Sequence, residues 1–254
     1  MLKLIKYELR KNRNALLILL AVAAALEAYF LVSMNMQKEA HMVTAVSLLT
    51  IAGFGIAIAV FAMGISSYSS ELKQRSSYLI FMTPNTPLAI ICSKMLFTLL
   101  LGVAYAAAFI GLMYVDVPLF LDYFGEWRGY YFLINQMMAE QGVQLSQFFM
   151  AVSFTLLAIV LEVLSIVGVA YLAVTISATV LNSKKVRGLV SFLIFAGISF
   201  ALSRISSLYI NDEKIFETMQ DMMVALIPAA IQSAIVIAAS IFGSAWLLEK
   251  HVSL

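Results

Sequence analysis

The stretch TIAGFGIAIAVFAMGIS, residues 50–66, contains no charged side chain. It belongs to an apolar run long enough to cross a bilayer as a helix, which takes roughly 20 residues for about 30 Å of hydrocarbon. A strand of a transmembrane barrel would instead alternate apolar and polar residues over about 10 positions, and this stretch does not. The stretch therefore predicts a membrane-spanning helix.

The rest of the 254-residue chain has the same character, being 63% hydrophobic and 12% charged with a mean hydropathy of +0.97. This composition excludes a water-soluble globule with an ordinary polar surface. Six runs have the length and apolarity of a span. They cover residues 15–34, 44–66, 95–115, 148–181, 188–207 and 224–248. We expect an all-α integral membrane protein with a single transmembrane domain, residues 1–254, and no separate soluble domain or internal repeat.

Basic residues are distributed unevenly between the segments that connect these runs. If both termini face the cytoplasm, twelve of the sixteen Lys and Arg residues lie on the cytoplasmic side and four on the other side. Such a bias is typical of membrane proteins, whose cytoplasmic loops are enriched in Lys and Arg. It supports both an even number of spans and a multi-pass protein of the cell membrane, expected to be a bacterial plasma membrane, with both termini cytoplasmic.

The first 14 residues, MLKLIKYELRKNRN, predict a short basic helix. Leu2, Ile5 and Leu9 lie on one stripe, and basic side chains occupy much of the remainder. A helix of this kind lies in the membrane interface, where long basic side chains reach lipid phosphates. A basic tail that only sets the orientation is the alternative.

The longest cytoplasmic segment predicted from this topology is SELKQRSSYLIFMTPNTPLAIICSKM, residues 70–95. An amphipathic helix can begin at Ser70, and Pro84 and Pro87 then interrupt it, because proline cannot continue a helix and restricts the residue before it. Thr86 followed by Pro87 is a good start for the next helix, with the threonine as the cap. The pattern predicts a helix, a rigid elbow and a second helix.

This arrangement resembles the membrane subunits of type-2 ABC exporters. The residues that carry the resemblance are Tyr7 and Glu8 in the basic amino-terminal helix, Glu71 after the second span, Arg75, the run YLIFMTP that ends at Pro84, and Lys94 at the start of the third span. The chain departs from the family where a glycine usually follows the basic patch, since serines occupy positions 76 and 77 here. This departure leaves the register of the helix open.

The resemblance implies that residues 70–87 form a coupling helix docked on a cytoplasmic ATPase. Glu71, Lys73 and Arg75 would be the docking residues, and Pro84 and Pro87 would set the elbow. The chain has no GxxxxGK sequence followed by Ser or Thr, so we expect it to be no enzyme and to bind no cofactor itself. ATP and Mg²⁺ would be bound by two partner ATPase subunits. A second copy of this chain, or a related permease, would complete the transporter in the lipid bilayer, and no nucleic-acid partner is expected.

Two acidic residues, Glu27 and Glu162, fall well within apolar spans, where a charge costs a few kcal/mol unless it is protonated, paired or hydrated. Glu27 could pair with Arg204 near the end of the fifth span. Glu162 lies among polar residues of the fourth span, where it could line a pathway or subunit interface, or make a buried structural hydrogen bond. A single cysteine and two distant histidines make a protein metal site unexpected.

Three classes of function follow. The first is the permease of an ABC exporter, which would move a hydrophobic or amphipathic substrate (peptide, lipid-like molecule or drug) outward by alternating access. The second is an ion-coupled carrier or channel that uses Glu27 and Glu162. The third, an intramembrane enzyme, lacks an intramembrane histidine or aspartate pair. The sequence leaves open the substrate, an immunity or sensing role, and the choice between a homodimer and a heterodimer.

Overall fold

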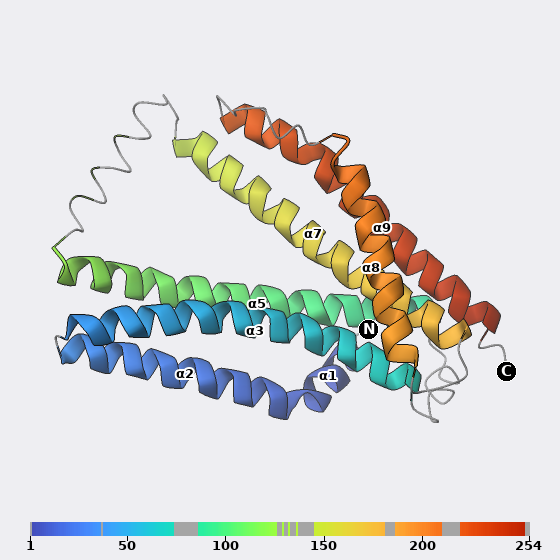
Figure 1. Cartoon of the computed structure of the whole chain (residues 1–254), viewed down its shortest axis with the longest axis horizontal. Helices are drawn as coiled ribbons and strands as arrows, with labels where there is room; N and C mark the ends of the chain where they lie inside the picture. The colour runs from blue at the N-terminus through green and yellow to red at the C-terminus, as the bar shows by residue number, and fades with distance from the viewer. Residues whose placement is uncertain are drawn as a thin grey trace. The chain divides into compact units, whose positions relative to one another are not determined.

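The computed structural model of the chain describes residues 2–36, 38–73, 86–125, 129, 132, 136, 145–180, 186–209 and 219–251. In these ranges the regular secondary structure is entirely helical, with seven helices and no strand (Figure 1). They are α1 (Leu2–Lys11), α2 (Arg13–Asn35), α3 (Glu39–Lys73), α5 (Pro87–Tyr123), α7 (Leu145–Val180), α8 (Arg187–Ser206) and α9 (Met219–His251). The prediction of an all-α protein is confirmed.

All of these helices except α1 are long and apolar enough to cross a membrane, which confirms the six predicted spans within the described ranges. Several helices extend beyond the predicted spans, α3 among them, which covers Glu39–Lys73 instead of residues 44–66. α5 continues to Tyr123 with Pro118 inside it, although the predicted span stopped at residue 115. α9 begins at Met219, five residues before the predicted span.

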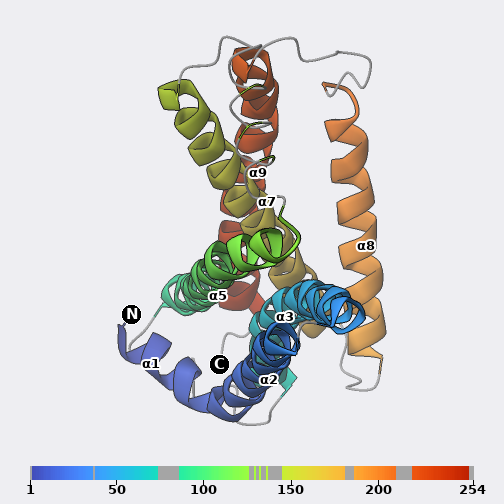
Figure 2. The same cartoon turned by 90° about the vertical axis from the view of Figure 1, so that its left-hand side faces the viewer.

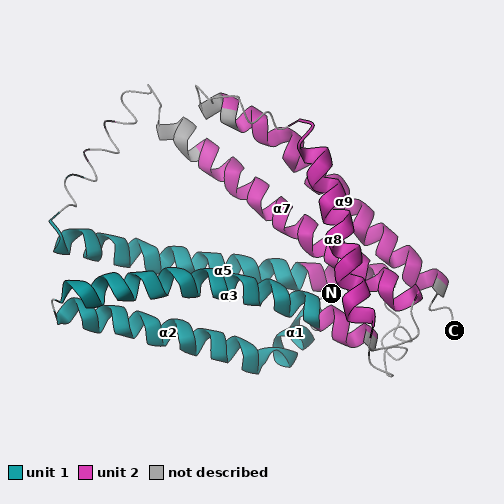
Figure 3. Cartoon of the chain, in the orientation of Figure 1, with its two compact units in different colours: residues 1–66, 96–130 teal, residues 67–95, 131–254 magenta. Residues whose placement is uncertain are grey.

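The chain forms two compact units, coloured separately in Figure 3. Unit 1 contains residues 1–66 and 96–130, and therefore α1, α2, most of α3 and most of α5. Unit 2 contains residues 67–95 and 131–254, and therefore α7, α8, α9 and the ends of α3 and α5 that flank residues 74–85.

In unit 1, α3 lies beside both α2 and α5 (Figures 1 and 2). Glycines allow α3 and α5 to approach closely, because a Cβ at Gly64 would meet the side chain of Thr98 and one at Gly53 would meet the ring of Phe109. A Cβ at Gly55 or Gly111 would have no neighbour within 4 Å. Gly53 and Gly64 therefore permit the close contact of α3 with α5.

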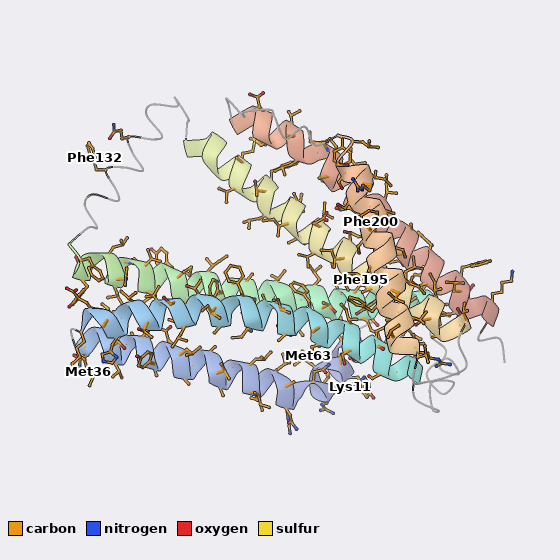
Figure 4. The ribbon with its side chains drawn as sticks, viewed as in Figure 1. Lys11, Met36, Met63, Phe132, Phe195 and Phe200 are labelled. Atoms are coloured by element: carbon orange, nitrogen blue, oxygen red, sulfur yellow. The ribbon has the colours of Figure 1, made fainter. Side chains whose placement is uncertain are left out.

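The amino-terminal helix α1 was expected, and it ends at Lys11, next to the start of α2. The side-chain amide of Asn12 donates a hydrogen bond to the carbonyl oxygen of Glu8 at 3.0 Å, which satisfies a carbonyl at the helix end. Ile5 is buried as its stripe predicts, but Leu9 is exposed and Glu8 is buried instead. Figure 4 labels Lys11 at this end of α2 and Met36 at the other.

In unit 2, α7 packs against both α8 and α9 and is the most buried of the six membrane-length helices. α7 and α9 run in the same direction, and α8 runs in the opposite direction (Figures 1 and 2). A Cβ at Gly168 of α7 would lie 3.2 Å from Cβ of Ser240, and one at Gly243 of α9 would lie 3.3 Å from Leu172. Small residues thus permit the close contact of α7 with α9, as is common between membrane helices.

Candidate functional site

A buried ion pair joins the two helices that flank residues 74–85. Nζ of Lys94 on α5 lies 2.7 Å from Oε2 of Glu71 on α3, and the two side chains are only 5% and 11% exposed. Glu71 lies two residues before the end of α3, and Lys94 lies in the second turn of α5. A charged pair taken out of water at this distance forms a strong hydrogen bond, and neither member can lose its partner without leaving a buried charge.

Next to this ion pair, aromatic residues attach α3 to α7. The rings of Tyr68 and Tyr171 stack with their centroids 4.4 Å apart. The hydroxyl groups of Tyr68 and Thr175 lie 2.6 Å apart, and Thr175 donates its own proton to the carbonyl oxygen of Tyr171 at 2.8 Å. Tyr68 is therefore the donor in its bond with Thr175. All three residues are buried, so this contact is well packed and its hydroxyl groups have partners.

We call these five residues, Tyr68, Glu71, Lys94, Tyr171 and Thr175, the loop-base cluster. They all belong to unit 2. The cluster fixes the end of α3 to the start of α5 and to the buried helix α7. The two helices that flank residues 74–85 are thus joined to each other, and α3 is joined to α7.

The structure places the predicted docking residues in different situations. Glu71 pairs with Lys94 rather than facing solvent, and α3 continues through Ser70 to Lys73 without the expected start of a new helix. Lys73 is the last residue of α3. Arg75 and Pro84, and with them the predicted elbow, lie outside the described residues. The docking role stays a prediction for these positions.

The predicted start of the helix after the elbow is confirmed. α5 begins at Pro87, and the backbone N–H of Ala89 donates to Oγ1 of Thr86 at 3.3 Å. Proline suits the first helical position because its missing N–H would have no partner inside the helix there. Thr86 supplies a cap to one of the remaining free N–H groups.

Glu162 makes the structural contact that was one of its two expected roles. The hydroxyl of Ser233 on α9 donates a hydrogen bond to Oε2 of Glu162 on α7. The glutamate is otherwise exposed, so this bond joins the two helices at the surface of their contact. A pathway role for Glu162 stays a prediction.

Arg204 lies in unit 2, whereas Glu27, its expected partner, lies in unit 1. Within unit 2, the guanidinium carbon of Arg204 lies 5.0 Å from the centre of the Phe200 ring, which Figure 4 labels on α8. A cation over an aromatic face at this distance is attracted by the ring. The pairing of Arg204 with Glu27 stays a prediction.

Asp116, which the sequence reading placed outside the spans, is the described neighbour of Glu27. The carboxyl groups of Glu27 on α2 and Asp116 on α5 lie within hydrogen-bonding reach of each other. Oε2 of Glu27 and Oδ1 of Asp116 are buried, and neither oxygen has a hydrogen-bond donor among the described residues. Two carboxyl groups so close together cannot both be ionised at low cost without a cation or a shared proton.

Metal binding finds no support in the described part of the chain, where no group of three or more His, Cys, Asp or Glu side chains could hold an ion. The acidic pair contributes only two such residues.

Comparisons with models of known families, with curated proteins and with solved structures find no match to this chain. The residues and their geometry therefore carry the functional argument.

Proposed function

We propose that this chain is the membrane-spanning permease subunit of an ATP-driven ABC exporter, and that residues 70–87 receive force from a cytoplasmic ATPase. The observation that carries the proposal is the loop-base cluster, in which a buried ion pair joins the two helices that flank this segment and stacked tyrosines join α3 to α7. The resemblance of the segment to the coupling region of type-2 exporters supports the same role.

The mechanism follows from how the segment is attached. A loosely tethered loop would absorb a push by bending, whereas a segment whose ends are paired and stacked transmits it to the helices that hold it. ATP and Mg²⁺ would be bound by two partner ATPases, since the chain has no phosphate-binding sequence of its own. Closure of the ATPases would displace residues 74–85, and α3, α5 and α7 would move in response. Two permease subunits would then expose a hydrophobic or amphipathic substrate outward.

Association with an ATPase tests the proposal. We expect the double variant Lys73→Ala, Arg75→Ala to lose a bound ABC ATPase during purification, because both basic side chains would lie at the docking surface. The matched control is Lys184→Ala, Lys185→Ala, which removes the same charge from another predicted cytoplasmic segment and should leave association intact. An equal loss in both variants, or no loss in either, would refute docking at this segment.

An ion-coupled carrier is the second candidate, and the proximity of Glu27 and Asp116 favours it. Adjacent carboxyl groups in an apolar setting are suited to taking up and releasing a proton or cation. Transport into proteoliposomes separates the two functions. The permease requires the ATPase and ATP, whereas the carrier requires only an ion gradient and would lose activity in Glu27→Gln.

A further inference from the structure

A cavity of about 740 Å³ opens in unit 1 between α2, α3 and α5, the teal helices of Figure 3. Its lining is almost entirely hydrocarbon and aromatic, and the four exceptions are Glu27, Thr50, Tyr105 and Asp116. None of the described lining residues is Lys, Arg or His. The cavity is thus apolar over most of its wall and acidic at one place.

The polar groups of the wall differ in what they can offer a ligand. Thr50 donates its hydroxyl proton to the carbonyl oxygen of Val46 at 2.9 Å, and Tyr105 donates to the carbonyl oxygen of Gly53. These two donors are already used. Glu27 and Asp116 bring two adjacent carboxyl groups to the wall, and one buried oxygen of each, Oε2 and Oδ1, has no donor among the described residues. Among the described lining side chains, the cavity therefore presents acidic groups and no basic one.

This imbalance determines the charge of a suitable occupant. An anion would meet two carboxyl groups and no basic side chain. A neutral molecule would leave a carboxylate of the pair without a counter-charge in an apolar wall, where a charge is costly. A monovalent cation would compensate one carboxylate while the second group keeps its proton. Aromatic side chains of Phe109 and Phe120 also line the cavity, and ring faces attract cations without needing a hydrogen bond.

The apolar part of the cavity determines what the rest of a bound ligand must be. Lining residues on α2 extend from Leu16 to Phe30, and at 1.5 Å per residue this wall is ~21 Å long. A hydrated metal ion would leave this wall uncovered. A bulky organic cation would cover it with its apolar groups and place its charge against the carboxyl pair.

We propose that this cavity is a binding site for lipophilic organic cations, with Glu27 and Asp116 as the charge-recognising residues. Binding here needs neither nucleotide nor an ATPase. That such a cation is also the exported molecule rests on the proposed function.

The test is equilibrium binding of radiolabelled tetraphenylphosphonium to the full chain in phosphatidylcholine nanodiscs without nucleotide. We expect saturable binding that unlabelled tetraphenylphosphonium displaces. Tetraphenylborate, which has the same shape and the opposite charge, should not displace it. The double variant Glu27→Gln, Asp116→Asn should bind at least tenfold more weakly, whereas Glu39→Gln, which neutralises an exposed carboxylate of the same unit, should bind as the parent chain does.

A second pair of variants tests the place of binding without touching the acids. Ala108→Trp puts a large ring into the cavity and should abolish binding, whereas Ala107→Trp, one position along α5 and absent from the lining, should not. Equal binding in both tryptophan variants, displacement by tetraphenylborate, or undiminished binding in the neutralised variant would overturn the inference. Failure of binding in a chain that still associates with its ATPase would overturn this inference alone.

Discussion

Removing Lys94 should destabilise the protein more than removing a charged residue from the surface does. The two charged atoms are 2.7 Å apart, and at an effective dielectric constant of 20 their gross attraction is about 6 kcal/mol. Most of this attraction offsets the cost of taking both charges out of water, so the net contribution of the intact pair is small. Loss of one member is different, because the carboxylate of Glu71 then stays buried without the opposite charge of Lys94. For Lys94→Met we expect the free energy of unfolding to fall by about 3–5 kcal/mol.

The double variant Glu71→Met, Lys94→Met separates burial of an unpaired charge from loss of packing. It removes both charges and keeps similar side-chain volume, and we expect its stability to return to within about 1 kcal/mol of the parent chain. Lys250→Met is the control, since this exposed lysine lies over the Trp246 ring at 5.0 Å and should contribute less than about 1 kcal/mol. Equilibrium unfolding in mixed micelles, followed by circular dichroism, measures all three.

The same variants separate positioning from docking. If the ion pair only holds the base of the segment, Lys94→Met should keep its ATPase partner while export per ATP hydrolysed falls. A Lys94→Met chain as stable as the control would refute the burial argument. Unchanged coupling of export to hydrolysis in a correctly assembled complex would refute the role of the cluster in transmission.

Three further changes test individual contacts in the same unfolding assay. Gly64→Ala should lower the free energy of unfolding by about 1–3 kcal/mol because its methyl group meets a threonine of α5. Gly55→Ala has open space around its methyl group and should be neutral or slightly stabilising. Equal effects of the two variants would contradict the close approach of α3 and α5. Tyr68→Phe should cost about 1–2 kcal/mol through its lost hydrogen bond, and Tyr7→Phe, at an exposed position, should change nothing measurable. Ser233→Ala should cost about 0.5–1.5 kcal/mol by removing the donor to the glutamate of α7, and an unchanged stability would show that this bond contributes nothing.

The spans could be predicted because hydropathy acts locally, over one helix at a time. The boundary of α5 could not, since the predicted span ended at residue 115, yet the helix continues through Pro118 to Tyr123. That error also hid Asp116. Because Asp116 was predicted to lie outside the spans, it was not considered as a neighbour of Glu27. Arg204 was expected to be the partner only because of its predicted depth in the membrane.

The loop-base cluster illustrates what a single sequence lacks. Glu71 and Lys94 were both identified, but the glutamate was expected to face an ATPase and the lysine to open a span. Their pairing depends on how the end of α3 meets the start of α5. The hydropathy pattern of a single helix does not predict its contacts with another helix. A usable signal was present in the opposite charges at the two ends of one connecting segment, which could neutralise each other.

Site-specific crosslinking tests the central claim most directly. The chain has a single cysteine, Cys92, so Cys92→Ser provides a background in which one new thiol reports one place. With Arg75→Cys in that background, a short bifunctional reagent should link the permease to its ABC ATPase in native membranes, and Phe132→Cys, in a segment predicted to face outward, should give no such product. Labelling of position 75 from the external side, or a complete absence of crosslinked ATPase at that position, would contradict the account.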